Sequence, residues 1–154
     1  MNSNVKTLLL SSINKTLDSM VLVIDSILNY KDYDESMDYT PKEREPYDAL
    51  SDRFIRCVEM CIKCFKSYDL YLSGEISNTF RDLLNNMDKM ELISSVDLWF
   101  DMRAVRNRIV HDYFPGQITR IYQSIVGDFY KEIADLRLKL ELLYDEVNDR
   151  GELR

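Results

Sequence analysis

Residues 101–113 bring together side chains that could bind a phosphate and move a proton. The segment has the sequence DMRAVRNRIVHDY and contains the only histidine of the chain, His111. Guanidinium groups bind phosphate oxygens through charge-assisted hydrogen bonds, and an imidazole exchanges protons near neutral pH. These residue types therefore indicate a phosphate-binding site in which Arg106 and His111 are the central pair.

Helical spacing places the polar groups of this segment on two adjoining ridges. Arg103, Asn107 and His111 follow one another at intervals of four residues and share one ridge. Arg106 and Tyr113 are seven residues apart, so they return to within about 20° of each other on the next ridge. We therefore expect a cation, an amide, an imidazole and a phenol to face one groove.

Most of the remaining surface of this helix is apolar. The apolar side chains of residues 96–113 cover an arc of roughly 260°, which is wider than the stripe of an ordinary surface helix. A narrow solvent face is left to Asp97, Asp101, Arg108 and Asp112. The helix is therefore predicted to be central or to lie at an interface, where buried polar groups need partners or a ligand. The alternative is a core histidine with satisfied hydrogen bonds and arginines that extend to the rim.

The same residues resemble a known motif. Arg106, His111 and Tyr113, within Val-Arg-Asn-Arg-Ile-Val-His-Asp-Tyr, resemble the Rx4HxY motif of the HEPN superfamily, in particular the HepT-like toxins of HepT/MntA toxin-antitoxin pairs. The resemblance covers roughly the C-terminal half, and the N-terminal half matches only as a helical hairpin. It implies an all-α, HEPN-like bundle that dimerises through the motif region and joins two copies of the site in one cleft.

The resemblance implies a metal-independent endoribonuclease that is the toxin of a bacterial or archaeal toxin-antitoxin system. His111 would exchange the proton of the RNA 2′-hydroxyl or of the leaving 5′-oxygen, and Arg106 would stabilise charge on the phosphorane. Asn107 would orient the phosphate or the imidazole, and Arg103 would add positive field. A nucleotidyltransferase antitoxin would neutralise the toxin by transferring AMP to Tyr113. No metal or other cofactor is expected.

Two other functions are compatible with the sequence. A non-catalytic helical subunit could bind substrate for a nucleotidyltransferase, since relatives of this fold that do so resemble the bundle without the full motif. A structural adaptor would predict that replacement of His111 changes only stability. The complete set of Arg106, His111 and Tyr113 favours the nuclease.

Length and composition favour a single helical domain over residues 1–154. The chain has four glycines and three prolines in 154 residues, which favours long helices. Its net charge of −7 argues against a surface built for non-specific nucleic-acid binding. No apolar run approaches the ~18 residues of a membrane span, and no signal peptide is recognised. The expectation is a cytoplasmic protein with no membrane contact.

Apolar periodicity predicts five helices in a largely antiparallel bundle. They cover about residues 3–30, 46–72, 79–90, 96–113 and 117–149. The buried stripe of the last helix is predicted to contain Ile121, Ile125, Phe129, Ile133, Leu136, Leu140, Leu143 and Val147. The surplus of apolar faces favours a symmetric homodimer.

Residues 31–45 are predicted to form an acidic, solvated and mobile linker. The positions of calcium ligands in an EF-hand loop are occupied by Asp32, Asp34, Ser36, Thr40 and Glu43. Met37 stands where the sharp turn of such a loop needs glycine, and Pro41 constrains the backbone. A calcium site is therefore the disfavoured alternative.

The three cysteines form a CxxxCxxC pattern on the second predicted helix, at Cys57, Cys61 and Cys64. This pattern is the cluster signature of radical-SAM enzymes, but that chemistry needs a flexible loop in a much larger α/β barrel. A zinc site would lack its fourth ligand. Buried free thiols are expected.

Overall fold

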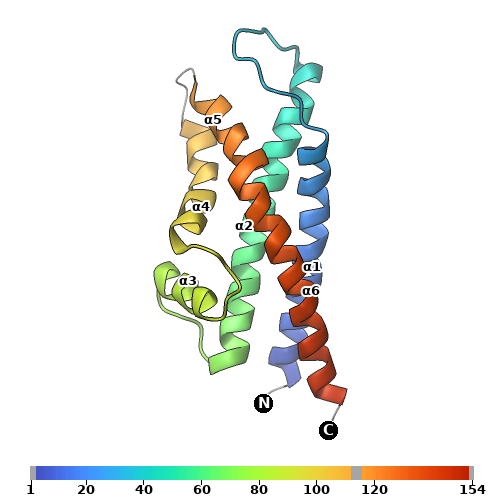
Figure 1. Ribbon diagram of the computed structural model, residues 1–154, viewed down its shortest axis with the longest axis vertical. Coiled ribbons are helices and arrows are strands. Elements are labelled where there is room, and N and C mark those ends of the chain that lie inside the picture. The colour runs from blue at the N-terminus through green and yellow to red at the C-terminus, as the bar shows by residue number, and fades with distance from the viewer. Residues whose placement is uncertain (1–2, 112–115, 153–154) are drawn as a thin grey trace.

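Three long helices run along the length of the molecule. In this computed structural model, which describes residues 3–111 and 116–152, they are α1(Ser3–Leu28), α2(Pro41–Ser73) and α6(Tyr130–Glu152). α1 runs antiparallel to both α2 and α6, and the two ends of the chain lie at the same end of the bundle (Figure 1). Fully buried side chains between the three helices include Leu9, Ile13, Met20, Leu50, Phe54, Phe65, Ile133 and Leu140.

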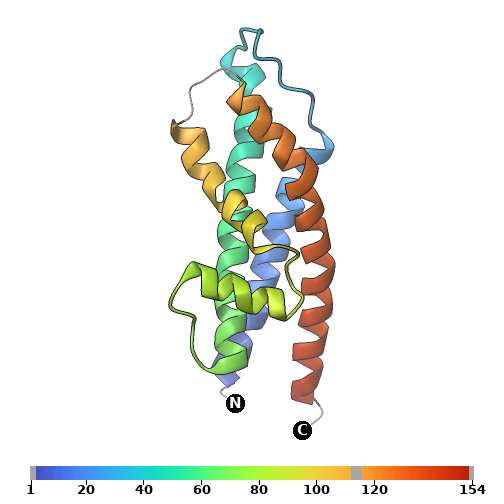
Figure 2. The same ribbon diagram turned by 60° about the vertical axis from the view of Figure 1, so that its left-hand side comes forward.

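Two shorter helices, α3(Phe80–Lys89) and α4(Val96–His111), cover one side of this core, and both contact α2 (Figure 2). Each helix begins at a hydroxyl cap. Thr79 Oγ1 accepts a hydrogen bond from the Asp82 amide at 3.0 Å, and Ser95 Oγ accepts one from the Leu98 amide at 3.2 Å. All regular structure within residues 3–111 and 116–152 is helical, so the predicted all-α bundle is confirmed.

The last predicted helix is bent rather than straight. It consists of α5(Gln117–Ser124), a π-helical turn η1(Ile125–Phe129), and α6. Gly127, with φ −101° and ψ −108°, interrupts the helical backbone within this turn. The eight residues predicted to form the buried stripe of this helix are all buried, so the prediction of its core face is confirmed.

The second helix begins at Pro41 and not at Pro46 as predicted. Thr40 and Glu43 form a capping box, in which each side chain accepts a hydrogen bond from the other residue's amide, at 3.2 and 3.3 Å. Two of the candidate calcium ligands are therefore used in a helix cap. Asp34 Oδ1 accepts hydrogen bonds from the amide and hydroxyl of Ser36, at 2.9 and 2.7 Å, so it belongs to a local turn.

Within the described part of the chain, α1 alone is long and apolar enough to cross a membrane, judged by length and composition. This corrects the expectation that no segment approaches that length. α1 packs against α2 and α6, and it buries Ile13, Met20 and Val23 completely. Core helices of bundles pass the same test of length and composition, so this finding is weak evidence for a membrane span.

The loop between α1 and α2 is anchored by aromatic rings and by one carboxylate. Tyr30, Tyr33, Tyr39, Tyr47 and Tyr122 form a cluster with ring centroids 5.0 to 6.1 Å apart. Beyond this cluster, the Glu35 carboxylate accepts hydrogen bonds from the Gly116 amide and from the Thr119 amide and hydroxyl. The linker thus differs from the mobile connection predicted, because it caps the start of α5.

α4 is fixed to the core by a buried tryptophan and a buried glutamate. Trp99 is fully buried, and its Nε1 donates a hydrogen bond to Glu132 Oε2 at 2.7 Å. Glu132 also accepts hydrogen bonds from the Ser94 amide at 3.1 Å and the Ser94 hydroxyl at 2.8 Å. The Trp99 ring meets Phe65 of α2 edge-on at 4.9 Å. These contacts join the start of α4 to both α6 and α2.

Replacement of Glu35 is expected to weaken the start of α5 in a pH-dependent way. Hydrogen bonds from the Thr119 hydroxyl, aided by backbone amides, lower the Glu35 pKa below its ordinary 4.5. A carboxylate with a lowered folded-state pKa stabilises the fold above its unfolded-state pKa and loses this effect as the pH falls through the folded value. Glu35→Gln should therefore melt below the wild type at pH 7, and the gap should close below about pH 4. A gap that is constant with pH would contradict this role.

Replacement of Glu132 is expected to lower the stability of the fold far more than replacement of Glu35. Glu132→Ala leaves the Trp99 and Ser94 donors without their acceptor, so the free energy of unfolding should fall by about 2 to 4 kcal/mol. Urea denaturation measures this change. Asp135→Ala, at an exposed position on the same helix, is the matched control and should change stability by less than about 0.5 kcal/mol. Equal effects of the two variants would refute the anchoring role.

Candidate functional site

The polar residues of α4 face solvent. α4 buries Trp99, Met102 and Val105, whereas Arg103, Arg106 and Asn107 are exposed. The predicted burial of these polar groups is therefore wrong, and so is the predicted position of Arg108 on the solvent face, whereas Asp97 and Asp101 are exposed as predicted. Arg108 is half-buried. The reason is that α4 lies on the edge of the bundle and contacts the core through one narrow stripe of side chains. The apolar residues on either side of that stripe therefore remain half-buried.

Arg103, Arg106 and Asn107 line one groove, as their spacing predicted. This groove lies between α4 and α2, has a volume of about 340 Å³, and is called the α4 groove below. Its other lining residues are Ile55, Val58, Glu59, Ile62 and Met102. The α4 groove thus combines an apolar floor with two guanidinium groups and an amide.

Arg106 is held by a carboxylate that the sequence analysis did not identify. Its Nη1 lies 2.8 Å from Glu59 Oε1, and the two side chains are 66% and 48% exposed. An ion pair this exposed contributes about 0 to 1 kcal/mol, so a phosphate can replace Glu59 at low cost. Glu59 lies on another helix, 47 residues from Arg106, and no local spacing marks their contact.

Arg103 is positioned by aromatic rings. Its guanidinium carbon lies 4.2 Å from the centre of the Phe80 ring, which in turn meets Phe100 edge-on at 5.0 Å. A cation over an aromatic face gains about 0.5 to 1 kcal/mol at an exposed site. Within residues 3–111 and 116–152 no carboxylate forms an ion pair with Arg103. Its charge is therefore available to a ligand in the α4 groove.

The sequence predicts that His111 and Tyr113 join the arginines in one groove. The backbone of His111 completes α4, which puts the residue on the ridge of Arg103 and Asn107. The side chain of His111 and the whole of Tyr113 lie outside the described residues. The predicted contact of His111 and Tyr113 with Arg106 therefore stays a prediction.

The three cysteines are buried and free, as predicted. Burial raises the pKa of Cys64 to about 11 and raises that of Cys61 well above its ordinary value. Both thiols therefore stay protonated at neutral pH and are poor nucleophiles and metal ligands. In the described ranges, no group of three or more His, Cys, Asp or Glu residues is placed to hold a metal ion.

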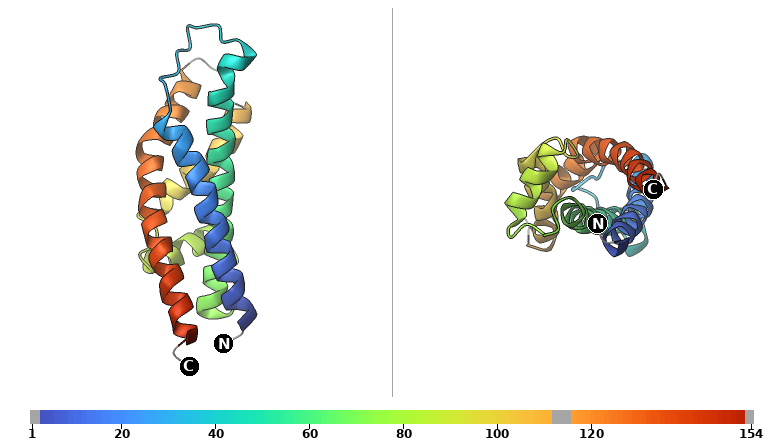
Figure 3. Two further views of the ribbon diagram at one scale, coloured as in Figure 1. Left: turned by 90° about the vertical axis from the view of Figure 1, so that its right-hand side faces the viewer. Right: turned by 90° about the horizontal axis from the view of Figure 1, so that it is seen from below.

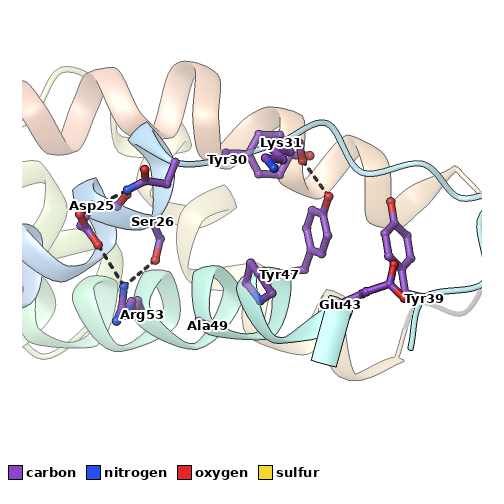
Figure 4. A pocket seen from close by; sticks show the side chains of 11 residues that line it. Asp25, Ser26, Tyr30, Lys31, Tyr39, Glu43, Tyr47, Ala49 and Arg53 are labelled. Carbon is purple, nitrogen blue, oxygen red and sulfur yellow. Dashed lines mark hydrogen bonds and ion pairs between the residues drawn. The ribbon is translucent and has the colours of Figure 1, made fainter. Parts of the chain in front are cut away.

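A second and larger cavity, of about 470 Å³, lies where α1 ends and α2 begins (Figure 4). Tyr30, Tyr39 and Tyr47 line it together with Arg53, and it is called the tyrosine pocket below. Burial raises the pKa of Tyr47 to about 12, so its hydroxyl stays protonated and donates to the Lys31 carbonyl at 2.9 Å. Arg53 Nη1 donates to Ser26 Oγ at 2.8 Å. The sequence analysis missed this pocket because it predicted residues 31–45 to be a solvated linker, whereas Tyr39 of this linker lines the pocket with Tyr30 and Tyr47.

Comparison with known proteins places this architecture in a family. No curated protein matches the chain. A family model described as nucleotidyltransferase substrate binding protein like matches residues 15–142. The matched range extends from within α1 to within α6 and includes Arg103, Arg106, Asn107 and His111. The chain therefore belongs to this family of nucleotidyltransferase substrate binding-like proteins, a helical family related to HEPN.

Proposed function

We propose that the protein is the substrate-binding partner of a nucleotidyltransferase and holds a phosphate-bearing substrate in the α4 groove. The observation that carries this proposal is the family match over residues 15–142, because the family is described by that role. The α4 groove supports it chemically. Arg103 and Arg106 supply positive charge, and Asn107 supplies an amide that can accept and donate hydrogen bonds.

The charge distribution also favours this assignment. The chain carries a net charge of −7, so an anionic substrate is repelled by most of the surface. The exposed guanidinium groups of Arg103 and Arg106 offer a local exception. A weakly held ion pair between Arg106 and Glu59 can open when a phosphate arrives. Binding would therefore be local and reversible, which suits a subunit that presents a substrate and releases a product.

The first test uses a cognate nucleotidyltransferase, which the proposed function predicts to be encoded beside this chain. We expect the two purified proteins to form a complex in size-exclusion chromatography with light scattering, and we expect the chain to stimulate nucleotidyl transfer. Arg106→Ala should keep the complex but reduce the stimulated transfer at least about tenfold, as for loss of a charged hydrogen bond.

Arg137→Ala is the matched control for this test, because Arg137 forms a similar exposed ion pair, with Glu141 at 3.4 Å, on α6. It should leave transfer unchanged. Absence of a complex, or equal effects of the two variants, would refute the proposed role.

A second candidate function is the metal-independent endoribonuclease toxin, which the full set of Arg106, His111 and Tyr113 in the sequence favours. His111 would act as general acid or base, Arg106 would stabilise the phosphorane, and Asn107 would orient the phosphate. Two copies that pack through α4 in a cytoplasmic homodimer would bring two such sets into one cleft. The same contact would cover the half-buried apolar residues on the flanks of α4. In this function the nucleotidyltransferase acts as an antitoxin that transfers AMP to Tyr113.

If the protein is a nuclease toxin, its toxicity should depend on the imidazole of His111. Expression of the wild-type chain alone should arrest growth of a bacterial host, and His111→Ala should remove this effect because proton transfer is lost. Circular dichroism and light scattering establish that the variant is folded and has the wild-type mass. Growth arrest by His111→Ala at the wild-type level, or no arrest by either chain, would exclude the nuclease.

A further inference from the structure

A second groove lies on the other side of α2 from the α4 groove. It runs between α1 and α2, has a volume of about 400 Å³, and is called the α1–α2 groove below. It is lined by Lys15, Asp18, Ser19, Leu22, Arg53, Arg56, Glu59, Met60 and Lys63. α2 lies between α4 and α1 in the view from below (Figure 3). Glu59 borders both grooves, so they meet at the exposed edge of α2.

Positive charge is concentrated along these two grooves. Their cationic side chains are Lys15, Arg53, Arg56, Lys63, Arg103 and Arg106, and their carboxylates are Asp18 and Glu59. The lining therefore has six cations against two carboxylates in a chain whose net charge is −7. By contrast, the tyrosine pocket and the groove between α2 and α6 each have two cations and two carboxylates.

Three of the four cations of the α1–α2 groove are available to a ligand, whereas the fourth, Arg53, is held by Asp25 at 3.7 Å and by Ser26 Oγ at 2.8 Å. Lys15 and Lys63 are exposed, and neither forms an ion pair with any residue that the structure describes. Arg56 pairs with Asp52 at 2.9 Å, with side chains 74% and 61% exposed. Such a pair is weak in water and can exchange its carboxylate for a phosphate.

We propose that the two grooves form one continuous surface that binds a single-stranded polynucleotide, with the α1–α2 groove holding the stretch next to the part bound at α4. This inference rests on the proposed function, in which the α4 groove binds a phosphate-bearing substrate. Residues 53–63 of α2, which border the α1–α2 groove, span about 15 Å at 1.5 Å per residue. A mononucleotide would occupy one groove only, whereas a strand with several phosphates engages both.

Two further features fit a strand rather than a compact anion. Leu22 and Met60 give the α1–α2 groove an apolar floor, as Ile55 and Ile62 do in the α4 groove, so sugars and bases find apolar contacts beside the cations. Arg53 borders both the α1–α2 groove and the tyrosine pocket. The α1–α2 groove therefore adjoins a cavity that contains tyrosine side chains, a type of side chain on which bases of single strands stack.

The test measures binding of a fluorescein-labelled single-stranded RNA by anisotropy at several salt concentrations, with a double variant, Lys15→Gln and Lys63→Gln. For single strands, each lost phosphate contact lowers the slope of log K against log salt by about 0.7. The variant should therefore lose about 1.4 in slope and bind about 25-fold more weakly at about 0.1 M salt. Neither lysine has an ion pair to lose, so the variant should fold and melt as the wild type does.

The matched control is the double variant Lys89→Gln and Lys131→Gln, which removes the same charge from exposed positions on α3 and α6 outside both grooves. It should keep the wild-type slope. Equal losses in the two double variants would overturn the inference, because they would reflect net charge alone. Competition by polyglutamate as strong as by unlabelled RNA would also overturn it, in favour of an acidic protein as the occupant.

Failure of this inference can be told apart from failure of the proposed function. If Arg103→Gln with Arg106→Gln weakens RNA binding while Lys15→Gln with Lys63→Gln does not, the α4 groove binds the substrate alone and the second groove plays no part. If the wild type binds no RNA but still forms the complex and stimulates nucleotidyl transfer, the inference that the ligand is a polynucleotide is wrong and the proposed function stands.

Discussion

The buried carboxylate of Glu132 is the interaction on which the position of α4 depends. A carboxylate that is 5% exposed needs donors, and the only ones recorded within the described residues are the Trp99 indole and the amide and hydroxyl of Ser94. Glu132 fixes the start of α4 to α6, and the contact of Trp99 with Phe65 determines where the helix meets α2. The α4 groove exists because that meeting leaves Arg103 and Arg106 on the solvent side.

A second carboxylate, that of Glu35, anchors the helix that follows the motif residues Arg106, His111 and Tyr113. Glu35 reaches from the α1–α2 loop to the first turn of α5 and supplies acceptors to amide groups that have no partner within the helix. α4 and α5 are therefore each anchored by a carboxylate from another part of the chain. One anchor is buried, whereas the other is exposed and depends on ionisation of Glu35.

Apolar periodicity predicted the core well because a buried stripe repeats within one helix. All eight residues that it assigned to the buried stripe of the last predicted helix are buried, and so are the three cysteines. It failed for the orientation of α4, where apolar residues occur almost all round the helix and so select no face. It also missed the partners Glu35, Glu59 and Glu132, which lie 33 to 84 residues from the groups they bind. Such contacts depend on how helices are placed, which local spacing does not encode.

The place of Glu59 between the two grooves explains how Arg106 can be paired in the free protein and still bind an anion. When a phosphate takes the place of Glu59 at Arg106, the released carboxylate would repel the ligand unless it turned away. The Glu59 side chain is 48% exposed, so water can hydrate its carboxylate once it leaves Arg106. Glu59 can therefore turn from α4 into solvent at little net cost, and Lys63 stays available to the strand in the α1–α2 groove. This exchange would leave Arg103 and Arg106 uncompensated in the α4 groove, where the proposed substrate needs positive charge.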